Sequence, residues 1–151
     1  MNTRYSRSGH VVFIGNGPVL WYSNVKLMLL NLAEAEFVAK APCCQNSNFV
    51  RRIINCANIP GIRFRLASGL WSDNQSSIAI ALNPVLHNRT KHIAIKYQYV
   101  NECVQNGSVV IDFLRSKDNF SDMFTKPVGP IIFLSHSCFV MGQMEIPREV
   151  V

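Results

Sequence analysis

The chain has 151 residues, of which 48% are hydrophobic and 16% charged, so it can bury the core of one domain and is too apolar to be disordered over most of its length. Its formal net charge of +6 favours an anionic partner, nucleic acid before membrane. No signal-peptide segment opens the chain, and the most apolar later stretch, residues 131–141, is well short of the ~20 residues of a spanning helix. We therefore expect a cytoplasmic or nuclear protein that is neither secreted nor held in a membrane. The five cysteines form no CxxC pair, which favours reduced thiols over a zinc site.

The first half of the chain predicts a hairpin followed by helix. Residues 10–23 contain two β-type runs around Gly15-Asn16-Gly17-Pro18, a typical hairpin turn. Residues 31–40 are helix-forming, with Asn31 as a candidate cap, and Pro42 should interrupt the pattern before a second helical run at residues 46–58. Two short helices or one kinked helix both fit this pattern.

The middle of the chain predicts a strand that meets a helix. Residues 62–72 read as a strand ending at Asp73, and residues 74–82 form a small-residue helix. Taken alone, Asp73 is explained as the N-cap of that helix, because its carboxylate can accept hydrogen bonds from the first free N–H groups.

The second half of the chain alternates helix and strand. Residues 91–105 predict an amphipathic helix, stopped by Asn106-Gly107. Residues 108–116 predict a strand, and residues 118–126 a short helix before Pro127. The predicted fold class is α/β in the broad sense, a mixed α+β arrangement with a mixed sheet.

Four segments resemble a known family. "EAEFVAK", "SDNQSSIAIALNP", "HNRTKHIAIKYQYVNECVQNG" and "NFSDMFTKP" stand in the order and approximate spacing of the ribonuclease H domain of copia-type LTR retrotransposon Pol polyproteins. The likeness runs from about Tyr5 to Pro127. It therefore predicts a ribonuclease H-like domain over residues 1–127 and a C-terminal tail of unconstrained shape over residues 128–151.

The resemblance implies a five-stranded mixed sheet flanked by helices, which cuts the RNA strand of RNA–DNA hybrids with two Mg²⁺ (or Mn²⁺) ions. Hard cations prefer oxygen ligands, and the family supplies four carboxylates in the order Asp, Glu, Asp, Asp. Carried over by motif, the catalytic and metal-binding residues are Glu36, Asp73 and Asp122. The implied partners are an RNA–DNA hybrid and the reverse transcriptase in the rest of the Pol polyprotein.

Some positions depart from the family pattern. The family's first Asp lies on a strand that precedes the hairpin, and here the hairpin follows Met1 by only a few residues. No acidic residue in residues 1–33 can replace that Asp, so we expect a truncated domain that lacks the first strand and has little or no catalysis. Pro42 interrupts a helix that the family continues, and Ala94 replaces an Asp.

Each carboxylate also has a structural explanation. Glu36 can pair with Lys40 at i,i+4, and Asp122 lies in a first helical turn, where the helix dipole favours an acid. The joint spacing of the three favours the ligand interpretation.

A basic and aromatic group around the third helical segment suits phosphate contacts and base stacking. Its predicted nucleic-acid-binding residues are Arg89, Lys91, His92, Lys96 and Tyr97. The alternative is an ordinary helix with Tyr97 in the core and solvated cations. At the level of function, the alternatives to a nuclease are a non-catalytic nucleic-acid-binding module and a non-functional transposon relic.

Overall fold

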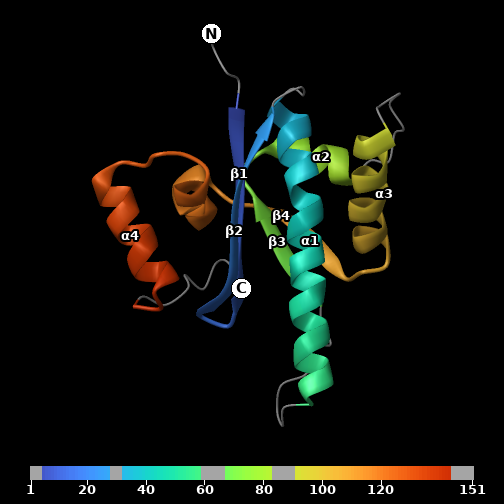
Figure 1. Ribbon diagram of the computed structural model, residues 1–151, viewed down its shortest axis with the longest axis horizontal. Helices are drawn as coiled ribbons and strands as arrows, with labels where there is room; N and C mark the ends of the chain where they lie inside the picture. Colours follow the sequence, from blue (N-terminus) through green and yellow to red (C-terminus); the bar gives the residue numbers. More distant parts are fainter. Residues whose placement is uncertain (1–4, 28–31, 59–66, 83–90, 144–151) are drawn as a thin grey trace. The chain divides into compact units, whose positions relative to one another are not determined.

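Figure 1 shows a computed structural model of the chain, which describes residues 5–27, 32–58, 67–82 and 91–143. The chain divides into two compact units. Unit 1 comprises residues 1–29 and 116–151, and unit 2 comprises residues 30–115. The order of hairpin, helix, strand, two helices, strand and short helices confirms the predicted mixed α+β fold class.

The described strands form two separate two-stranded sheets, one in each unit. The resemblance implies a single five-stranded sheet, and the described residues do not form one. Each of the four described strands is hydrogen-bonded only to its partner in the same unit. The division into residues 1–127 and 128–151 stays a prediction.

Helix α1 (Leu32–Ala57) is the longest element of unit 2, and it continues through Pro42. Of the two predicted alternatives, two separate short helices is wrong, because a single helix spans both segments. A proline inside a helix costs about 3 kcal/mol or more because it removes one hydrogen bond and crowds the preceding turn. That cost is offset by the face that carries Phe37, Ala41 and Cys44, all at most 2% exposed. Asn58, in the left-handed region at φ 45°, ends the helix; the predicted cap Asn31 lies outside the described residues.

The sheet of unit 2 is a parallel pair. Strand β3 (Ser68–Ser72) lies beside β4 (Val109–Phe113), with Leu70 opposite Ile111. Parallel strands need a long crossover, and here it contains helices α2 (Gln75–Leu82) and α3 (Lys91–Gln105). The bounds of α3 match the prediction, and its stop at Gly107 has the expected positive φ of 69°. Of the predicted strand at residues 62–72, residues 62–66 lie outside the described residues, and β3 begins at Ser68.

The core of unit 2 lies between this sheet and the helices. Val109 and Ile111 are buried and alternate with exposed neighbours, so one face of the sheet is covered. Arg51 of α1 donates from Nη1 to the Ser108 carbonyl at 2.8 Å and to Ser68 Oγ at 3.3 Å, which ties the helix to the starts of both strands. The core cluster comprises Phe37, Ala41, Cys44, Leu70, Ala81, Tyr97, Val100, Cys103, Val109 and Ile111.

Unit 1 is built on the predicted hairpin. Strands β1 (Tyr5–Ile14) and β2 (Gly17–Leu27) pair antiparallel, and Gly15 takes the positive φ of 55° that the tight turn requires. The 3₁₀ turn η2 (Phe120–Phe124) lies on this hairpin, where Ser23 Oγ donates to the Phe124 carbonyl at 2.7 Å. A Cβ at Gly9 would stand 2.8 Å from Cβ of Phe124, so the close approach requires glycine there.

The rest of unit 1 is a short 3₁₀ turn, η1 (Ser116–Asp118), and a helix, α4 (Pro130–Val140), within the segment predicted as a tail. The helix contacts η2 through the stacked rings of Phe120 and Phe139, whose centroids lie 3.8 Å apart. His136 Nε2 lies 3.1 Å from the Lys117 carbonyl. Of the helix predicted at residues 118–126, the structure forms the 3₁₀ turn η2 at residues 120–124, and Asp118 is the last residue of η1.

Across the described residues, no helix combines the length and apolar composition that crossing a membrane requires. All five cysteines are free thiols.

Candidate functional site

The candidate site stands where the two parallel strands of unit 2 end. Ser72, the last residue of β3, is paired with Phe113, the last residue of β4, and Asp73 follows Ser72 directly. The carboxyl ends of parallel strands meet at one edge of a sheet, which is the usual place for ligands in α/β folds.

Asp73 does not cap the helix that follows it. Ser77 N donates to the side-chain oxygen Oδ1 of Asn74 at 3.0 Å, so Asn74 is the N-cap of α2. Ser77 Oγ also donates to the Asn74 carbonyl, at 2.9 Å. The interpretation of Asp73 as the N-cap is wrong by one residue, and its half-buried side chain lines a pocket instead.

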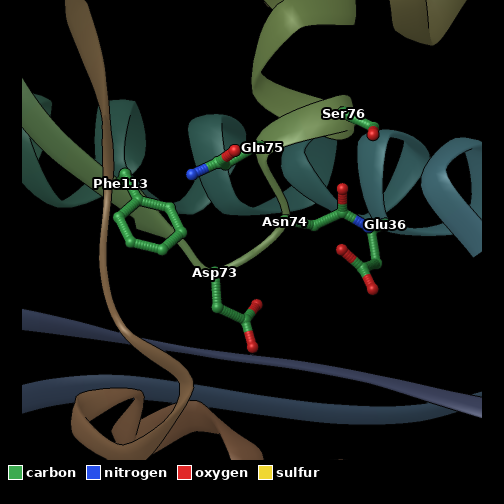
Figure 2. Close-up of a pocket in the computed structure, with 6 residues that line it drawn as sticks. All are labelled: Glu36, Asp73, Asn74, Gln75, Ser76 and Phe113. Carbon is green, nitrogen blue, oxygen red and sulfur yellow. The ribbon is translucent and has the colours of Figure 1, made fainter.

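Glu36 reaches the same pocket from α1. Its neighbours Phe37 and Val38 are buried, which fixes the rotation of the helix and leaves Glu36 half-buried at the edge of the core. The pocket measures about 420 Å³. Figure 2 shows the carboxylates of Glu36 and Asp73 directed into the same open space. Its lining residues are Glu36, Asp73, Asn74, Gln75, Ser76 and Phe113.

Lys40 stands on α1 one helical turn after Glu36, and the sequence did not predict it as a site residue. It is only 5% exposed, and its Nζ donates to Ser72 Oγ at 3.0 Å and to Ser77 Oγ at 2.6 Å. Burial lowers the pKa of Lys40 to about 8, while the nearby carboxylates of Glu36 and Asp73 act to raise it. The available signal was its spacing, because Lys40 falls on the face of α1 that carries Phe37 and Cys44.

The donor set of the pocket fits a hard cation. Two carboxylates from different elements face one space, and oxygen ligands are those that Mg²⁺ and Mn²⁺ prefer. Within the described part of each unit, however, no three His, Cys, Asp or Glu side chains are grouped closely enough to hold a metal ion. Glu36 and Asp73 are thus two candidate ligands that depend on further oxygens from solvent or substrate.

Asp122, the third predicted ligand, belongs to unit 1. It stands in η2, where its Oδ2 lies 2.7 Å from Nζ of Lys126 and its Oδ1 accepts from Nδ2 of Asn119 at 3.3 Å. These contacts give Asp122 a local structural role. Its participation in a site with Glu36 and Asp73 stays a prediction.

The predicted nucleic-acid-binding residues are placed unequally. Arg89 lies outside the described residues, and α3 begins at Lys91 and His92, whose side chains are likewise not described. Lys96 is exposed on α3. Tyr97 is 6% exposed, donates to the Ile80 carbonyl at 2.8 Å and packs on Phe37, so it has the core position that the alternative interpretation assigned to it.

The fold and the pocket together define an α+β protein with two convergent carboxylates at the carboxyl ends of a parallel strand pair. No protein-family model matches the sequence, and no solved structure matches the fold. The chain is 28% identical, over 94% of its length, to the retrovirus-related Pol polyprotein from transposon RE2 of Arabidopsis thaliana. It is 30% identical over 85% to the corresponding polyprotein from transposon RE1 of the same plant, and 26% identical over 85% to that from transposon TNT 1-94 of Nicotiana tabacum.

These similarities span nearly the whole chain but only 9–10% of each relative. The chain is therefore a homologue of one segment of retrotransposon Pol polyproteins.

Proposed function

We propose that the chain is the ribonuclease H segment of a retrotransposon Pol polyprotein and hydrolyses the RNA strand of RNA–DNA hybrids at a low rate, because its pocket offers only two of the family's four carboxylates. The observation that carries the proposal is the meeting of Glu36 and Asp73 in one pocket, from α1 and from the end of β3. The similarity to Pol polyproteins supports it independently. On this proposal the covalent partner is the reverse transcriptase of the same polyprotein, and the protein acts in the cytoplasm or nucleus.

In the proposed mechanism, Glu36 and Asp73 would hold Mg²⁺ or Mn²⁺. A bound ion would supply Lewis-acid stabilisation of the charge that develops on the phosphate. The protein contributes rigid positions: Asp73 is held between β3 and the Asn74-capped start of α2, and Glu36 is set by the buried face of α1. The net charge of +6 attracts the hybrid backbone, and exposed Lys96 is available for a phosphate contact.

The test is cleavage of a hybrid whose RNA strand is labelled, with Mg²⁺ present. Asp73→Asn keeps the shape of the side chain and removes its charge. We expect at least a 100-fold loss of rate, since even indirect metal partners commonly contribute about 10–100-fold. The matched control is Asp112→Asn, an exposed aspartate of β4 that does not line the pocket, and it should cleave like the wild type.

Equal cleavage by wild type and Asp73→Asn would show that another site is responsible. Absence of cleavage in the wild type contradicts the nuclease proposal itself.

The second candidate function is non-catalytic binding of nucleic acid, which the positive net charge and the exposed cation on α3 favour. A binding module retains affinity for a labelled hybrid in Asp73→Asn, and that affinity falls as salt rises because phosphate contacts release counterions. Fluorescence anisotropy at two salt concentrations measures both properties. Salt-dependent binding without cleavage would favour this function over the nuclease.

A further inference from the structure

Lys40 is a buried cation without an explanation in the proposed chemistry. Lysine is almost never fully buried unless it is paired, and this one is 5% exposed. Its Nζ is held by two hydroxyls, Ser72 Oγ at 3.0 Å and Ser77 Oγ at 2.6 Å. Ser72 directly precedes Asp73, so the ammonium group is hydrogen-bonded to the sequence neighbour of a predicted metal ligand.

Among the described residues, two carboxylates and two thiols act on this ammonium group. The carboxylates of Glu36 and Asp73 attract it, and the thiols of Cys43 and Cys44 lie nearby on α1. Burial opposes the charge and is the largest influence, yet the pKa of Lys40, at about 8, still leaves it predominantly protonated at pH 7. A cation that is part of the protein therefore partly neutralises the two carboxylates of the pocket.

We propose that Lys40 is the built-in counter-cation of the Glu36–Asp73 pocket and that it weakens the binding of divalent cations there. The inference rests on the proposed function, because it assumes that the pocket accepts a metal ion. The positive charge of Lys40 offsets part of the negative charge that Glu36 and Asp73 present to an incoming ion. Hydrogen bonds to Ser72 and Ser77 hold the ammonium group in this position. Lys40 is thus a residue that sets how readily the pocket is occupied.

A purely structural role makes a different prediction. If Lys40 only ties α1 to β3 and α2, removing the lysine or removing its serine partner should loosen the pocket in the same way. The charge and the tie can be separated, because Ser77→Ala removes the shorter hydrogen bond at 2.6 Å and leaves the ammonium group in place. Lys40→Met removes the charge and keeps most of the apolar stem.

The experiment is a Mn²⁺ titration of the full chain at pH 7, in which electron paramagnetic resonance reports the free ion. We expect the Kd for Mn²⁺ to fall at least about tenfold in Lys40→Met, because repulsion between like charges is strong in a partly buried site. Lys40→Gln, which keeps a donor for the serines, should show the same direction and guards against misfolding of the methionine variant. Ser77→Ala should bind no more tightly than the wild type.

Adding Asp73→Asn to Lys40→Met should abolish the gain, which locates the tighter binding in the pocket. An equal or larger Kd in both Lys40 variants overturns the role of Lys40. If that happens while Mn²⁺ binding by the wild type still depends on Asp73, the metal pocket is supported and only the proposed role of Lys40 is refuted. If neither the wild type nor the Lys40 variants bind Mn²⁺ in a manner that depends on Asp73, both the counter-cation and the metal pocket are refuted.

Discussion

The two units hold their structure in different ways. Unit 2 packs three helices around a parallel strand pair and anchors its longest helix by two cations, Lys40 and Arg51, hydrogen-bonded to the strands. Unit 1 is a hairpin with an aromatic cluster around Phe120, and its helix α4 leaves Ile131 86% and Leu134 65% exposed. The candidate pocket belongs to the unit whose side chains are fixed by a deep core. Convergent carboxylates need such rigidity, because ligand positions must be held closely.

The largest expected difference between the units concerns their apolar side chains. Phe37 is fully buried, with its ring centroid 4.3 Å from that of Tyr97, and Phe37→Ala should lower the free energy of unfolding by about 3–5 kcal/mol. The matched truncation in unit 1, Ile131→Ala, removes an exposed side chain. It should change the free energy of unfolding by less than about 0.5 kcal/mol. Urea denaturation followed by circular dichroism measures both. Similar losses for the two variants would contradict the contrast between the units.

The pH dependence of stability tests the buried cation of unit 2. Burial lowers the pKa of Lys40 from 10.5 to about 8 in the folded protein. Between pH 8 and 10.5 the folded chain has lost a proton that the unfolded chain keeps, so stability rises with pH in this window. The slope is about 1.4 kcal/mol per pH unit.

The measured quantity is the free energy of unfolding of the wild type minus that of Lys40→Met, at several pH values. The difference is necessary because burial raises the pKa of the Cys43 thiol from 9.0 to about 12, which lowers stability as pH rises above 9 in both proteins. Lys96→Met, which removes an exposed lysine of α3, is the matched control. A flat difference between pH 8 and 10 would show that Lys40 is not buried in solution.

Turn and helix signals that depend on local backbone chemistry could be read from the sequence. Gly15 and Gly107 both take the positive φ that their turns require, so the hairpin and the end of α3 were predictable. The sequence around Pro42 could not decide between two helices and one, because the penalty of the proline is local, while the buried face of α1 that offsets it depends on tertiary packing.

The pocket was predictable only in part. Glu36 and Asp73 follow from the resemblance, and they do line one pocket. The cap at Asn74 was assigned to Asp73 because both residue types cap helices equally well and stand next to each other. The placement of Lys40 required knowing that Ser72 and Ser77, far away in the sequence, face the same side of α1.

The smallest expected effect on stability concerns Asp122, which is either a partner in a local ion pair alone or also a metal ligand. Its ion pair with Lys126, whose side chain is 58% exposed, contributes at most about 1 kcal/mol. Asp122→Asn should therefore change the free energy of unfolding by less than that. If Asp122 is also a metal ligand, as the resemblance implies, cleavage of the labelled hybrid should fall about 100-fold or more in this variant.

Lys126→Met is the control, since it removes the same ion pair and leaves the carboxylate in place. Equal, small stability changes in the two variants, with cleavage lost only in Asp122→Asn, would assign unit 1 a part in the chemistry as well as in folding. Undiminished cleavage in Asp122→Asn would instead confine the predicted acidic ligands to Glu36 and Asp73. Stability and rate must be measured together, because a loss of rate that follows a loss of folding would say nothing about a ligand.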